Sequence, residues 1–298
     1  MDYRDHRPDL NPKLFTLLAS GVGLRQSARS LKLSLRCCEL KFRKLARHLR
    51  RLNLNLRASL PSGSSFQFDE LESYEGRRNS RPLSVPLLIE RETRFIVWAE
   101  AAPIRPRGSM NKARLRAIEH DEKRLGRRRD RSRTSLERTL RRGAALAVNL
   151  PKVIVDSDEK SSYPKLAREA FGAHRLEHHR TNSRRPRTPS NPLFAINHTE
   201  AMLRDLTGRL RRDSWLVSKK RRYLDLGLQL ISAWRNYVRR RFNPDMLSAA
   251  AMLGFVPRRM SEEELCSWRQ DWGADSIHPL ACRGESVAQR MAGRAAMA

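Results

Sequence analysis

Apolar side chains recur at helical spacing through the first part of the chain, from residue 10 to residue 54. Two glycines in residues 20–23 predict a break between a first helix and a short second helix over about 24–31. A longer basic helix is predicted to begin near Ser34, whose hydroxyl suits an N-cap. A short helix, a tight turn and a longer basic helix predict a helix-turn-helix that binds DNA. An ordinary helical hairpin with a solvated basic face is the alternative interpretation.

The spacing of apolar residues changes after residues 61–65, a Pro, Ser and Gly segment that predicts a linker. Residues 65–68 alternate as a strand and run into Asp69, and the apolar runs 82–90 and 94–99 flank three polar residues. This pattern predicts three consecutive antiparallel strands. The preceding residues 1–60 then form a small all-α domain.

A second strand-rich region follows a helix predicted over about 132–147. Residues 152–156 form an apolar run that ends in Asp156, and apolar residues on both faces are typical of a central strand. An edge strand is predicted at 174–178, between helices at about 162–171 and 197–212. A long amphipathic helix is predicted over about 219–238 and a short one near 247–253. The order of elements predicts an α/β domain over 66–243 and a partly disordered C-terminal extension over 244–298.

The charge of the chain indicates its partner. Lys and Arg number 61 against 32 Asp and Glu, so the formal net charge is +29, and nucleic acid is the expected polyanion. The excess peaks in a basic insertion at about 105–133, which favours a phosphate-contacting segment over a solvated loop. Four cysteines and no long apolar stretch predict reduced thiols in a cytoplasmic protein without a membrane segment.

Two acids at strand ends are candidates for chemistry. Asp69 follows the first strand and Asp156 the fourth, and strand ends are where ligands collect in α/β sheets. A third acid on a neighbouring helix completes a set of oxygen ligands suited to a hard cation such as Mg²⁺. Asp158 is an alternative to Asp156, but it follows the predicted end of the strand, so Asp156 is preferred. Glu177 and Asp205 are alternatives for the third acid.

The stretch from residue 197 to residue 220 carries a resemblance. A Glu opens a helix, Leu-Arg and Arg-Leu pairs follow, and a Ser-Lys pair precedes a long helix with an Asn near its end. The chain thereby resembles the DDE transposases of bacterial insertion sequences, most closely the first-named insertion-sequence family, although zinc-binding cysteines before the helix-turn-helix are absent. The matching positions are Glu200, Leu203, Arg204, Arg209, Leu210, Arg212, Ser218, Lys219 and Asn236, with Phe68 to Leu71 and Val155 to Asp156 for the other two acidic motifs.

The resemblance implies a fold and an activity. It implies a ribonuclease-H-like mixed sheet flanked by helices, with two Mg²⁺ or Mn²⁺ ions held by Asp69, Asp156 and Glu200. Activated water would cut at the element's end, and the freed 3′-hydroxyl would attack target DNA. The implied partner is double-stranded DNA, both terminal repeats and target, bound by a homo-oligomer at the bacterial nucleoid. The residues expected to contact DNA are Arg36, Lys41, Arg43, Lys44 and Arg47 in the third helix, and Arg204, Arg209, Arg211, Arg212 and Lys219 near Glu200.

Two other functions compete with this one. A degenerate transposase kept as a non-catalytic DNA-binding regulator would retain the basic helix and lose metal binding. A basic RNA-binding protein is more distant, because aromatic residues make up only 6% of the chain and supply few surfaces for base stacking.

Overall fold

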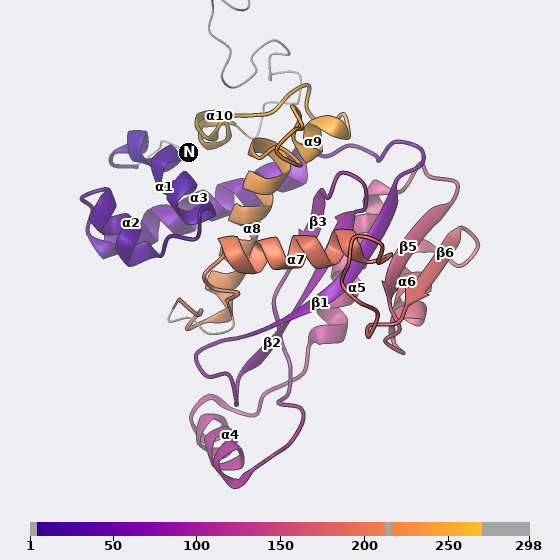
Figure 1. Cartoon of the computed structure of the whole chain (residues 1–298). Coiled ribbons are helices and arrows are strands. Elements are labelled where there is room, and N and C mark those ends of the chain that lie inside the picture. Colours follow the sequence, from indigo (N-terminus) through magenta and orange to yellow (C-terminus); the bar gives the residue numbers. More distant parts are fainter. Residues whose placement is uncertain (1–4, 212–215, 270–298) are drawn as a thin grey trace, which may run out of the picture.

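The N-terminal region of the computed structural model, which describes residues 5–211 and 216–269, is helical (Figure 1). A 3₁₀ turn, Pro8–Leu10, precedes helices α1 (Asn11–Ala19), α2 (Leu24–Ser30) and α3 (Leu35–Asn55). Ser34 caps α3, because its Oγ accepts a hydrogen bond of 3.1 Å from the backbone N–H of Cys37. The three helices and this cap confirm the elements predicted from the sequence.

A mixed sheet forms the centre of the molecule. Its strands are β1 (Ser65–Tyr74), β2 (Pro82–Glu90), β3 (Ile96–Ala99), β4 (Ala102–Pro103), β5 (Val153–Asp158) and β6 (Leu176–Thr181). The order is β3-β2-β1-β5-β6, with β4 paired to β2. The first three strands are antiparallel, whereas β5 runs parallel to β1 and to β6. The predicted three-stranded meander is confirmed, as are the central strand predicted at 152–156, which is β5, and the edge strand predicted at 174–178, which is β6. The arrangement is compatible with a ribonuclease-H-like core.

Helices cover both faces of the sheet, and the alternation of side chains along β1 assigns each face. Phe66 and Phe68 point toward α6 (Tyr163–Phe171), with ring centroids 5.4 Å from Phe171 and 4.7 Å from Tyr163. Helix α5 (Ser132–Leu146) packs beside α6 on this face. Gln67 points the other way, and its Oε1 accepts a hydrogen bond of 3.0 Å from the N–H of Ile196 in α7 (Phe194–Leu206). Polar positions of β1 on the α7 face are therefore available for a site.

The N-terminal helices and the sheet share one hydrophobic core. Phe42, Leu45 and Leu49 of α3 belong to the same buried cluster as the strands. Helix α3 packs against α8 (Arg221–Ala233), and Asn53 Nδ2 donates a hydrogen bond of 3.0 Å to the carbonyl of Gln229. The region predicted as a separate domain over residues 1–60 is thus packed on the remainder of the chain.

Three features of the fold were not predicted. Helix α4 (Lys112–Leu125) lies inside the basic insertion and is capped by Asn111, whose Oδ1 accepts from the N–H of Arg114. Helix α8 continues as a π-helix over Trp234–Val238. In the extension, α10 (Glu262–Ser267) was not predicted, whereas α9 (Ala249–Met252) confirms the short helix predicted near 247–253. Over the described residues, no helix is long and apolar enough to cross a membrane.

Candidate active site

Asp69 and Asp158 come level with each other on adjacent parallel strands. The register of β1 and β5 pairs Gln67 with Asp156, so the residues two positions further along are level and share that face. Both Asp69 and Asp158 line one cavity of about 240 Å³, together with Glu70, Glu72 and Lys160 among others. The structure thus brings together Asp69, which was predicted as a site residue, and Asp158, to which Asp156 was preferred.

Asp156 has a different environment, two residues earlier on β5. It is 2% exposed, and its Oδ2 accepts from Gln67 Nε2 at 3.1 Å and pairs with Arg91 Nη1 at 3.3 Å. Its Oδ1 lies 3.2 Å from His179 Nδ1. Gln67 also donates to the carbonyl of Pro192 at 2.6 Å. Asp156 therefore helps to fasten the start of α7 to the sheet, and its oxygens are already engaged.

The prediction that the fourth strand ends at Asp156 is wrong. Strand β5 continues to Asp158, which pairs with Thr181 of β6, so Asp158 belongs to the strand. Asp69 is likewise inside β1, which continues to Tyr74 because its partner β2 pairs with it along nearly the whole length. The ladders with neighbouring strands, not the apolar runs, set where these strands end.

Glu200 lies on α7 above the same face of the sheet and is 4% exposed. Helix α7 starts over Gln67, through the Ile196 N–H, and the chain after the helix reaches Ser73, whose Oγ lies 3.4 Å from the carbonyl of Arg209. Helix α7 thus crosses this face of β1, from Gln67 toward the end of the strand that carries Ser73 (Figure 1). Glu200 is one helical turn after Ile196, so it lies on the α7 side of β1, the side to which Asp69 also belongs. Glu200 does not line the 240 Å³ cavity.

Glu70 belongs to the opposite face of β1, as the alternation of the strand requires. Its carboxylate accepts from Ser84 Oγ at 2.6 Å and from the Tyr163 hydroxyl at 3.1 Å, and it pairs with Lys160. These partners hold Glu70 at the α6 side of the cavity.

Burial raises the pKa of Asp69 to about 6, and the charges of Asp158 and Glu70 act in the same direction. The N–H of Glu70, 2.7 Å from Asp69 Oδ1, and the cation of Arg187 oppose the rise. Such a carboxyl is poised for a cation, because a bound metal removes the repulsion between neighbouring carboxylates.

We expect metal binding to depend on the protonation of Asp69. Mn²⁺ affinity of the full chain should fall by up to about tenfold per pH unit below pH 6, because a protonated carboxyl is a poor ligand. Without metal, the raised pKa of Asp69 leaves the free energy of unfolding unchanged below about pH 4. It lowers that free energy progressively as the pH rises to about 6, because the buried carboxyl then ionises. Calorimetric titrations between pH 5 and pH 7.5 measure the affinity. A constant affinity across that range, or one unaltered by Asp69→Asn, would contradict the assignment.

The donor chemistry of the set fits Mg²⁺ or Mn²⁺. Asp69, Asp158 and Glu200 offer only carboxylate oxygens, the ligands that hard divalent cations prefer. Within residues 5–211 and 216–269, no three acidic, His or Cys side chains are already gathered at metal-ligand spacing. Metal binding at this site would therefore draw the side chains of the three residues together from positions on one face.

The basic residues of α3 divide into exposed and buried ones. The prediction that Lys41 contacts DNA is wrong, since Lys41 is 3% exposed, pairs with Asp5 at 2.9 Å and donates to Asn11 Oδ1 at 3.1 Å. It ties α3 to the segment before α1. The other four residues named on α3 are Arg36 and Arg47, which are exposed, and Arg43 and Lys44, which are half-buried.

The basic residues near Glu200 also divide. Arg209 packs between helices, its guanidinium 5.4 Å from the Phe42 ring centroid and 3.1 Å from Ser218 Oγ, and burial lowers its pKa. This position suits a structural bridge between α3 and α8 better than a DNA contact. Arg211 is exposed and donates to the carbonyl of Asp205 at 2.6 Å. Lys219 is exposed, Arg204 is half-buried, and Arg212 lies outside the described residues.

The sequence contains a signal for Asp158 that the apolar run concealed. Asp156 and Asp158 are two apart and face the same side of a strand, and only pairing with β6 shows that both lie within it. Gln67 carries no comparable signal, because its role depends on the amide and carbonyl groups that α7 presents to it.

Compared with known proteins, the chain matches no family model and no curated protein.

Proposed function

We propose that the protein is a DDE-type transposase that cleaves DNA strands with bound metal ions and transfers them to target DNA. The observation that supports this most is the placement of Asp69 and Asp158 level with each other on adjacent parallel strands, at one cavity. Glu200 lies above the same face, and the strand order is compatible with a ribonuclease-H-like core. The net charge of +29 supports a polyanionic substrate.

In this proposal Asp69, Asp158 and Glu200 hold two Mg²⁺ ions. Bound magnesium would activate the attacking oxygen and stabilise the leaving oxygen at phosphorus. Other side chains of the protein would position Glu200 and hold the DNA. The Asp156–Gln67 contact fixes the start of α7 and with it the position of Glu200. Arg187, whose charge reaches Asp69, and the exposed Arg211 are placed to hold DNA phosphates near the site.

The test is cleavage of a labelled duplex that carries the DNA bordering the protein's own gene. We expect strand cleavage with Mg²⁺ or Mn²⁺ and none with EDTA or Ca²⁺ alone, because Ca²⁺ tolerates a looser ligand geometry than Mg²⁺ does. Glu200→Gln should abolish cleavage and keep DNA binding, measured in parallel by fluorescence anisotropy. Tight, specific binding without cleavage under any divalent cation would favour the non-catalytic regulator instead.

A further inference from the structure

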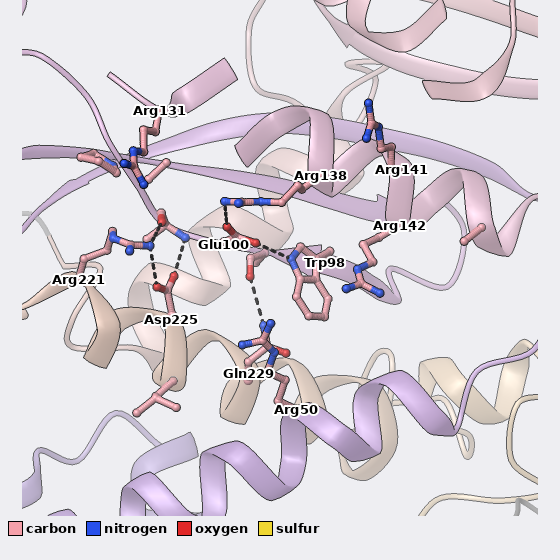
Figure 2. A pocket seen from close by; sticks show the side chains of 16 residues that line it. Arg50, Trp98, Glu100, Arg131, Arg138, Arg141, Arg142, Arg221, Asp225 and Gln229 are labelled. Atoms are coloured by element: carbon pink, nitrogen blue, oxygen red, sulfur yellow. Dashed lines mark hydrogen bonds and ion pairs between the residues drawn. The ribbon is translucent and has the colours of Figure 1, made fainter. Parts of the chain in front are cut away.

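A second polar site lies at the β3 edge of the sheet, away from the carboxylates. It is a groove of about 600 Å³ between α3, α5 and α8, with the chain from Trp98 to Pro103 along its floor (Figure 2). Six arginines from three helices or their ends line it: Arg50, Arg131, Arg138, Arg141, Arg142 and Arg221. Strand β3 is two strands from β1, so roughly 10 Å of sheet separates the groove from the strand that carries Asp69.

Positive charge exceeds negative charge in this groove. Its two acids, Glu100 and Asp225, each pair with one arginine, Glu100 with Arg138 and Asp225 with Arg221 at 3.1 Å. Across the described part of the chain, the other four arginines have no ion pair with a carboxylate. All four have exposed side chains. The groove therefore holds six arginine cations against two carboxylates.

Trp98 holds several of these cations in position. Its ring is 3% exposed and lies under the guanidinium of Arg142 at 5.0 Å and that of Arg50 at 5.6 Å. The indole N–H donates to Glu100 Oε2 at 3.3 Å, and the same carboxylate pairs with Arg138. Cation–π contacts and this shared carboxylate reduce the freedom of the arginine side chains, which lowers the entropic cost of binding an anion.

The arginines form a row instead of a single pocket. From residue 131 to residue 142 the helical rise spans about 16 Å, longer than one phosphate group, and the same face repeats at 138, 141 and 142. We propose that this groove binds the sugar-phosphate backbone of double-stranded DNA, independently of sequence, at a site separate from the carboxylates. The inference rests on the proposed function only for the identity of the polyanion as DNA.

The test measures how DNA binding by the full chain depends on salt. A triple variant, Arg131→Gln, Arg141→Gln and Arg142→Gln, should reduce the slope of log K against log salt by about 2–3, since each lost phosphate contact contributes about 0.9. Affinity at low salt should fall at least about tenfold, and equally for gene-bordering and random duplexes. The corresponding Arg→Lys triple variant should retain most of the slope, because it keeps the charges.

A matched control removes the same charge elsewhere. Lys165→Gln, Arg168→Gln and Arg180→Gln change exposed basic residues on α6 and β6, outside both the groove and the basic insertion. Equal slopes for the groove variant and wild type would overturn the proposal. An equal decrease in both triple variants would overturn it too, because the effect would then come from net charge alone. Loss of mononucleotide binding with the DNA slope unchanged would instead assign the groove to a small phosphorylated ligand.

Cleavage separates this inference from the proposed function. The groove variant should cleave at the wild-type rate once DNA is saturating, whereas Asp158→Asn should bind DNA with the wild-type slope and not cleave. If wild type fails to cleave but the groove variant still lowers the slope, the transposase proposal fails and the groove remains a backbone site.

Discussion

Replacement of Arg128 by Met should lower the free energy of unfolding by about 3 kcal/mol, as expected when a buried ion pair loses one partner. Arg128 and Glu75 have side chains only 6% and 10% exposed and are 2.9 Å apart. Arg128 also donates from Nε to the carbonyl of Ile104 at 2.9 Å and from Nη2 to that of Pro82 at 2.6 Å. Loss of the guanidinium leaves the buried Ile104 carbonyl without this donor, whereas the Pro82 carbonyl still accepts from the N–H of Ile104 at 3.3 Å.

Glu75 keeps part of its environment in this variant. Burial raises the pKa of Glu75, but the hydrogen bonds from Arg128 and from the N–H of Arg221 hold it below its ordinary value. Arg81, 2.9 Å away, still pairs with the carboxylate after the substitution, so the loss falls at the lower end of the range for buried pairs.

Urea unfolding followed by circular dichroism measures the effect, and the neighbouring residue supplies the control. Arg129 is exposed, so Arg129→Met should change stability by less than about 0.5 kcal/mol. Equal stability of the two variants would show that Arg128 does not anchor the basic insertion to Glu75 and to the start of β2.

Asp158→Asn should reduce metal-dependent cleavage by about a thousandfold or more, equivalent to at least about 4 kcal/mol of activation free energy. The substitution keeps the side-chain volume and removes the charge that a hard cation requires. DNA binding should persist, because one fewer negative charge lies near the phosphates.

Asp156→Asn is the matched substitution, two residues away on the same strand and the same face. It weakens the ion pair with Arg91 at 3.3 Å and the contact with His179, while an amide can still bond to Gln67. We expect lower stability by about 1–3 kcal/mol and a cleavage rate within about tenfold of wild type.

Most elements of the fold could be predicted because their signals are local. The cap at Ser34 and the period change near residue 65 each require only neighbouring residues. Strand ends are different. Tyr74 and Asp158 end β1 and β5 because β2 and β6 continue beside them, and pairing between distant segments leaves no mark in a window of ten residues.

The functional side chains were harder to predict because a side chain's role depends on what packs against it. Lys41 has the same residue type and helical setting as a phosphate-binding lysine, yet Asp5, from the segment before α1, buries it. Arg128 sits in a nearly pure charge run and is an anchor in the core. The groove around Trp98 joins residues from 50 to 229, a separation that no motif spans.

Cleavage by two matched variants tests whether Asp69, Asp158 and Glu200 hold the catalytic metals. Wild type, Asp158→Asn and Asp156→Asn are compared for Mg²⁺-dependent cleavage of the gene-bordering duplex at saturating protein, with folding checked by circular dichroism. We expect cleavage by wild type and Asp156→Asn and none by Asp158→Asn. Cleavage by Asp158→Asn at the wild-type rate, with Asp156→Asn folded but inactive, would contradict it.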